Sequence, residues 1–130
     1  MKNRILVDTT IWIEFFRQRS KIGEPLEKLL MENGVWTCGI VLFEILQGIK
    51  SEGEKSKILI LLSGLPYVEM TKALWERAAV LSASLRKSGV SLPLSDIFIA
   101  TIAIENDLSV FTLDNHFAQI SNLKLHFLRK

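Results

Sequence analysis

The chain has 130 residues, of which 48% are hydrophobic and 23% charged, with a formal net charge of +2. This composition indicates a folded domain with its own core and excludes a disordered chain. No apolar run approaches the roughly 20 residues that span a bilayer, and the single Cys38 excludes an internal disulfide. Asp8 interrupts the first apolar stretch, which a signal peptide would keep apolar. We therefore expect a cytoplasmic protein with no membrane partner.

Short apolar runs alternate with helical segments along the chain. In order, the pattern predicts a strand at 4–7, helices at 11–17 and 24–33, a strand at 35–38, a helix at 40–49, a polar turn at 51–57, a helix at 58–62, a strand at 67–70, helices at 72–88 and 93–106, a strand at 110–112, a short helix at 115–120 and a strand at 123–128. Strands that alternate with helices predict parallel βαβ units. The expected fold class is α/β, with a central parallel sheet flanked by helices on both faces.

Nothing divides the chain, because it contains no internal repeat, low-complexity tract or Pro/Gly-rich linker. Residues 1–130 are therefore expected to form one domain. Two of its helical segments, 40–46 and 97–104, are apolar on nearly every side. A helix that is apolar all round is normally buried, so we expect both to lie largely inside the core.

Four acids stand alone in long uncharged stretches: Asp8 within 5–13, Glu44 within 35–48, Asp96 within 90–104 and Asp114 within 108–123. Asp8 and Asp114 follow the carboxyl ends of expected strands. Glu44 and Asp96 lie in the early turns of helices. In an open parallel sheet these places meet at one edge, where such folds bind their ligands. We therefore expect the four carboxylates to line one cleft.

Carboxylates gathered in such a cleft repel one another, by roughly 4 kcal/mol for a pair about 4 Å apart at an effective dielectric of 20. A divalent cation removes this penalty. Oxygen ligands without a set of thiolates or imidazoles favour Mg²⁺ or Mn²⁺. Asp96 or Glu44 is then a candidate to take a proton from an attacking water. Neither His116 nor His126 has an obvious partner in the sequence. We expect His116 to be a surface residue at the start of a helix and His126 to be a strand residue.

Each acid also has a simpler explanation. Asp96 is a first-turn acid that the helix dipole stabilises by about 0.3–1 kcal/mol. Asp8 and Asp114 can be explained as turn residues, because aspartate is common in turns. Glu69 is equally isolated but lies within a strand, where we expect it to face solvent. A different chemistry is also open, because an Asp after a strand is the nucleophile of haloacid-dehalogenase-type and receiver-type phosphoryl transfer. The second Asp usual two residues later is, however, Thr10 here.

The segments ILVDTTIWIEFF, CGIVLFEILQGI and SLPLSDIFIATIAIENDLSVFTLDNHF, in this order, resemble those of the PIN-domain nucleases, in particular the VapC-type toxins of prokaryotic toxin–antitoxin pairs. The resemblance covers nearly the whole chain and implies a PIN domain that acts as an Mg²⁺- or Mn²⁺-dependent endoribonuclease. The family's acidic quartet, both catalytic and metal-binding, maps onto Asp8, Glu44, Asp96 and Asp114, with Thr9 and Thr112 supporting the cleft.

The same resemblance implies an RNA substrate, an antitoxin protein whose tail covers the cleft, and a homodimer. Apolar residues within 11–16 and 45–49 are candidates for either protein surface, or for the core. In-line attack by an activated water leaves a 5′-phosphate and a 3′-hydroxyl. The remaining alternative is a PIN scaffold that only binds RNA or protein; loss of one acid would have favoured it, and all four are present.

Overall fold

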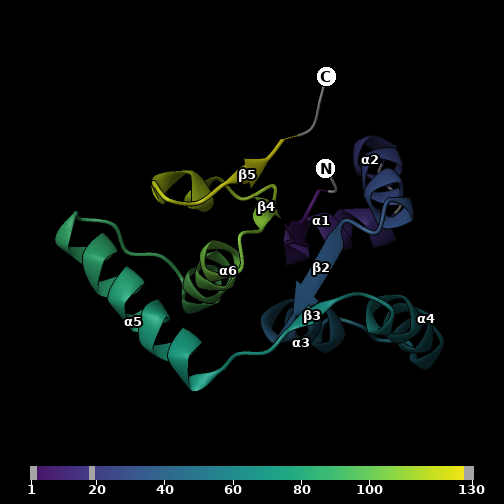
Figure 1. Ribbon diagram of the computed structural model, residues 1–130. Coiled ribbons are helices and arrows are strands. Elements are labelled where there is room, and N and C mark those ends of the chain that lie inside the picture. Colours follow the sequence, from purple (N-terminus) through teal and green to yellow (C-terminus); the bar gives the residue numbers. More distant parts are fainter. Residues whose placement is uncertain (1–2, 18–19, 128–130) are drawn as a thin grey trace.

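Five short strands and the helices between them alternate along the computed structural model, which describes residues 3–17 and 20–127 (Figure 1). In chain order the elements are β1 (Ile5–Val7), α1 (Thr9–Phe16), α2 (Ser20–Met31), β2 (Val35–Cys38), α3 (Gly39–Gln47), α4 (Glu52–Ser63), β3 (Tyr67–Val68), α5 (Lys72–Lys87), α6 (Leu94–Glu105), β4 (Ser109–Phe111), the 3-10 helix η1 (Asn115–Gln119) and β5 (Leu125–His126). The end of the last predicted strand, at Leu128, lies outside the described residues.

The strands form one sheet in the order β3-β2-β1-β4-β5, and every neighbouring pair is parallel. Helices α1 and α2 lie on one side of it and α5 and α6 on the other (Figure 1). This arrangement confirms the predicted α/β class with helices on both faces. The chain moves from β1 to β2 in one direction and later returns to place β4 on the other side of β1, so the strand order reverses between β1 and β4.

The core is built from the strands and from the helices on both faces of the sheet, with helix α6 the most continuously buried of them. Leu6 and Val7 of β1 have no exposed surface, and Ile99 of α6 is equally buried. Residues 96–103 are all buried, because α6 packs against the sheet and also against α5. The second contact includes an edge-to-face ring pair, Trp75 with Phe98, whose centroids are 4.6 Å apart. Each large apolar side chain buried in this way contributes about 1.5–3 kcal/mol to folding.

Helix α3 departs from the expectation that an apolar helix is buried. Of its nine residues, Val41 and Ile45 are the buried ones, and Phe43 is 64% exposed. The prediction of a largely buried helix was therefore wrong for α3 and right for α6. The physical reason is that α6 has neighbours on two sides, whereas one face of α3 is left uncovered in this chain.

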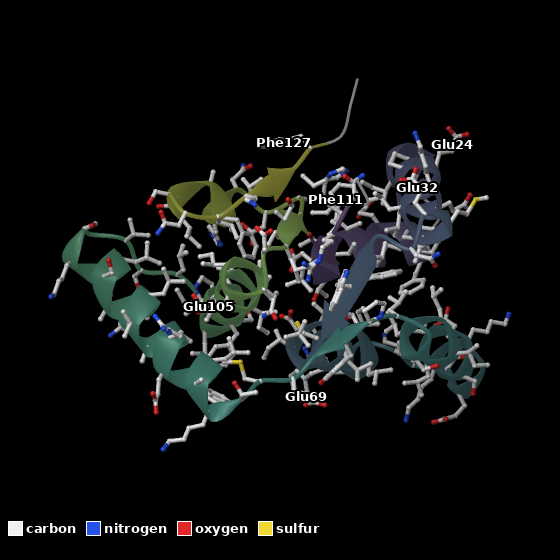
Figure 2. All side chains as sticks on the ribbon, in the orientation of Figure 1. Glu24, Glu32, Glu69, Glu105, Phe111 and Phe127 are labelled. Carbon is white, nitrogen blue, oxygen red and sulfur yellow. The ribbon has the colours of Figure 1, made fainter. Side chains whose placement is uncertain are left out.

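The polar segment 51–57 was predicted as a turn, and this prediction was wrong. It forms the first half of α4, whose N-cap Ser51 accepts a hydrogen bond from the Glu54 backbone N–H at 3.2 Å. Ser51 and Glu54 have the spacing of a capping box, a helix-start signal that was present in the sequence. Glu69, by contrast, is exposed as expected and points away from the sheet (Figure 2). None of the described helices is long and apolar enough to cross a membrane.

Candidate active site

The reversal of strand order places Asp8 and Asp114 next to each other in the fold. Asp8 directly follows β1, and its backbone N–H donates to the carbonyl of Phe111 at the end of β4, at 2.9 Å. Asp114 lies three residues beyond Phe111, whose position in β4 is labelled in Figure 2. In open α/β sheets this edge, outside the carboxyl ends of the strands, is where ligands bind.

The Asp8 carboxylate is held by two threonine hydroxyls. Asp8 is the N-cap residue of α1 but makes no side-chain capping bond, and it is only 4% exposed. Its Oδ2 accepts hydrogen bonds from Thr10 Oγ1 at 2.9 Å and from Thr112 Oγ1 at 2.7 Å. An Asp used merely to begin a helix would accept from the backbone N–H groups of the first turn. The bonding of Asp8 is therefore directed at the strand edge.

The same two hydroxyls tie the β1–α1 turn to the β4–η1 turn. Thr10 Oγ1 accepts from the backbone N–H of Leu113 at 3.0 Å, and Thr112 Oγ1 accepts from that of Asp114 at 2.9 Å. Thr112 was expected to support the cleft, but Thr10 was considered only as a missing Asp. The role of Thr10 could have been predicted from the sequence, because a Thr close to an Asp in the chain often forms a local hydrogen bond.

Glu44 reaches the site from α3. Its Oε1 accepts a hydrogen bond from Thr9 Oγ1 at 2.8 Å, which joins it to the residue beside Asp8. Cys38, the last residue of β2, is buried, and burial raises the pKa of its thiol. The charges of Asp8 and Glu44 raise that pKa further, so both carboxylates lie within electrostatic reach of the same sulfur.

Asp96 lies in the first turn of α6 and is only 7% exposed. Burial raises the pKa of its carboxyl, a hydrogen bond with His116 opposes that rise, and the charges of Asp114 and Asp8 add to it. Burial and like charges both disfavour the ionised form. The ionised form of Asp96 therefore carries an electrostatic cost in the fold.

His116 joins Asp96 to Asp114. Its Nδ1 lies 3.0 Å from Asp96 Oδ2 and 3.1 Å from Asp114 Oδ1, and its backbone N–H donates to the same Asp114 Oδ1 at 2.9 Å. The expectation of a histidine without a partner was wrong, although the side chain is 50% exposed, as a surface residue would be. Sequence reasoning missed the pairing because α6 and η1 meet only in the folded chain.

Of the four predicted acids, the fold brings Asp96 and Asp114 together through His116. Asp8 lies within electrostatic reach of Asp96, and Glu44 is linked through Thr9 to the residue beside Asp8. One oxygen each of Asp96 and Asp114 and one ring nitrogen of His116 lie within 4.8 Å of one another. Among residues 3–17 and 20–127, none of the four carboxylates forms an ion pair with a Lys or Arg. Clustered carboxylates whose basic neighbour is a histidine, itself a metal-ligating side chain, rather than a Lys or Arg, fit a divalent cation.

The family model of the PIN domain matches residues 5–123, and the chain belongs to this family. Within it, the chain is similar to the VapC ribonucleases. It is 30% identical over 128 residues to Ribonuclease VapC11 of Mycobacterium tuberculosis and, to the same extent, to VapC ribonuclease Mb1587 of Mycobacterium bovis. Each alignment covers 92% of this chain and 96% of the relative. The recognition of a VapC-type PIN domain is confirmed.

Solved structures show the same fold. VapBC2 from Rickettsia felis, bound to a DNA fragment from its promoter, matches with a TM-score of 0.80 and 24% identity over 94% of this chain and 96% of that one. FitAcB from Neisseria gonorrhoeae matches with a TM-score of 0.76 and 20% identity over 94% and 96% of the two chains.

Proposed function

We propose that the chain is a metal-dependent endoribonuclease of the VapC type, the toxin of a toxin–antitoxin pair, and that it acts in the cytoplasm. The observation that carries the proposal is the group of partly buried carboxylates at the strand-order reversal, which has no Lys or Arg counter-ion among the described residues. Its similarity to named ribonucleases supports RNA as the substrate. Family membership favours this function over phosphoryl transfer through Asp8.

The proposal assigns a task to each polar side chain of the site. Asp8, Asp96 and Asp114 would hold Mg²⁺ or Mn²⁺, with Glu44 beside them. When bound, such an ion supplies Lewis-acid chemistry that activates water and offsets the charge developing on the phosphate oxygens. Thr112 fixes the orientation of Asp8, and Thr10 and Thr9 do the same for Asp8 and Glu44.

The carboxylates of the site also indicate how the RNA would be cut. Asp96 and Glu44 are the candidates to accept the proton of the attacking water, because carboxylates are the proton acceptors at hand. Attack by water in line with the departing 3′-oxygen forms a new P–O bond and breaks the P–O3′ bond, which leaves a 5′-phosphate and a 3′-hydroxyl. No 2′-hydroxyl is needed as a nucleophile in this chemistry.

We also propose that a small antitoxin binds over α1 and α3. These helices pack together, and each exposes an apolar side chain, Ile13 at 37% and Phe43 at 64%. A surface of this kind on a folded domain is typical of a protein contact. A homodimer is part of the same proposal, supported by Trp75 and Val80, which are 52% and 68% exposed on α5. Light scattering with and without the antitoxin tests both contacts.

The test of the nuclease is a labelled single-stranded RNA incubated with the protein and Mg²⁺. We expect cleavage that EDTA stops and that Asp96→Asn abolishes, with products that a 5′-phosphate-dependent exonuclease degrades. Glu69→Gln is the matched control, because Glu69 is an equally isolated acid that points to solvent. Cleavage that survives EDTA or Asp96→Asn would overturn the proposed site.

A further inference from the structure

We propose that His116 is a direct ligand of the cation and gives the site a preference for Mn²⁺ over Mg²⁺. The inference rests on the proposed function, in which the acids hold a divalent ion. It starts from an arrangement to which the proposed function assigns no task. One ring nitrogen lies against two carboxylate oxygens, one from α6 and one from the N-cap residue of η1.

The fold itself positions the imidazole. The His116 backbone N–H donates to Asp114 Oδ1, so the histidine and one of its acid partners are fixed in the same turn. The next residue, Phe117, is fully buried, and Ile120 just beyond η1 is 4% exposed, so the core anchors this segment. The ring is therefore brought to Asp96 by the packing of η1 against α6, although half of the His116 side chain remains in solvent.

The distances from the ring nitrogen to the two carboxylate oxygens match those between adjacent ligands of a metal ion. An octahedral ion with ligand bonds of about 2.1 Å holds adjacent ligand atoms about 3.0 Å apart. The Nδ1 of His116 lies 3.0 Å and 3.1 Å from the two carboxylate oxygens, and all three atoms fall within 4.8 Å of one another. A cation can thus take the place of the hydrogen-bonding proton with little movement of the chain.

A nitrogen ligand changes which ion binds best. Both Mg²⁺ and Mn²⁺ bind carboxylate oxygens and water, but Mg²⁺ is the harder ion, and Mn²⁺, a transition metal, accepts an imidazole nitrogen among its oxygen ligands more readily. Replacing one oxygen by Nδ1 of His116 therefore strengthens Mn²⁺ binding relative to Mg²⁺. The competing explanation is that His116 acts only as a cationic partner that relieves repulsion between Asp96 and Asp114; its loss would then change the binding of both ions to a similar extent.

Pulsed electron paramagnetic resonance of Mn²⁺-loaded, tag-free protein separates these explanations. The chain has two histidines, so an imidazole nitrogen coupled to Mn²⁺ belongs to His116 or to His126. We expect the coupling in the wild type and in His126→Phe, and its loss in His116→Ala. His126→Phe is the matched control because His126 packs edge-to-face on Phe111, which another aromatic ring can replace.

Calorimetric titrations supply the second readout. We expect His116→Ala to weaken Mn²⁺ binding at least tenfold and Mg²⁺ binding less than threefold, in line with the loss of one ligand. Absence of nitrogen coupling in the wild type, or equal weakening for both ions, would overturn the inference. Mn²⁺ binding that Asp96→Asn removes but that shows no nitrogen coupling would leave the carboxylate site standing without His116. Absence of Mn²⁺ binding would defeat both.

Discussion

Helices α3 and α6 have a similar apolar composition and different surroundings. Both are strongly apolar, and each carries one acid of the site, Glu44 in α3 and Asp96 in α6. Residues 96–103 of α6 are all buried, whereas Val41 and Ile45 are the buried residues of α3. Apolar composition therefore indicates burial only when neighbouring elements cover every face. Where they do not, as at Phe43, an apolar side chain remains exposed, and this exposure is the basis of the proposed antitoxin contact.

Asp96 and Glu44 differ in burial in the same way as the helices that carry them. Asp96 is enclosed by α6, η1 and the sheet edge, and burial raises its pKa. Glu44 is half-buried, and a single hydroxyl, that of Thr9, donates to its Oε1. We therefore expect replacement of Asp96 to have the larger functional effect of the two.

The largest effect should come from the acids themselves. In the presence of Mg²⁺, Asp96→Asn should lower the initial rate of RNA cleavage by about 10³-fold or more, and Glu44→Gln by about 10²-fold, because each removes a charge from the site. Circular dichroism checks that both variants are folded. A greater loss in Glu44→Gln than in Asp96→Asn would reverse the order that burial predicts.

A core substitution tests the difference in burial directly. Ile99→Ala in α6 should lower the free energy of unfolding by about 2–5 kcal/mol, because it leaves a cavity in a close-packed region. Phe43→Ala in α3 should change it by about 0.5 kcal/mol or less, as for an exposed side chain. Urea denaturation of the two variants measures both values. Similar losses in the two helices would mean that Phe43 is covered.

The hydroxyl bonds of the site allow a smaller perturbation. Thr112→Val removes a hydrogen bond to the Asp8 carboxylate, a type worth about 1.5–3 kcal/mol, and cleavage should fall by roughly tenfold to a hundredfold. Thr37→Val is the matched control, because the buried Thr37 Oγ1 has no hydrogen-bond partner among the described residues. Thr37→Val should leave the rate of RNA cleavage unchanged and should leave the free energy of unfolding unchanged or raise it. Equal effects of the two substitutions would refute the role of Thr112.

The smallest effect concerns stability without metal. The pKa of Asp96 is raised in the fold, so its contribution to stability is full at pH values below its unfolded pKa and is lost as pH rises through the folded pKa. In EDTA, Asp96→Asn should therefore melt slightly higher than the wild type at neutral pH, and the two melting curves should converge in acid. A variant that melts lower at neutral pH would contradict the assigned cost of this carboxylate.

Much of this edge was predictable because strand ends are visible in a sequence. The apolar runs before Asp8 and before Asp114 predict parallel strands, and parallel strands have their carboxyl ends at the same edge of the sheet. The pairing of His116 with Asp96 was not predictable, since it depends on how η1 packs against α6. The exposure of Phe43 was hidden for a similar reason: periodicity describes one helix and not the neighbours that cover it.

The paired threonines around Asp8 have one further consequence. Because Oδ2 already receives two hydroxyl protons, Asp8 offers an incoming ion chiefly its other oxygen. Asp8 would then bind an ion through one oxygen rather than chelate it through both, which would leave more of the ion open to an oxygen of the phosphate that is to be cut.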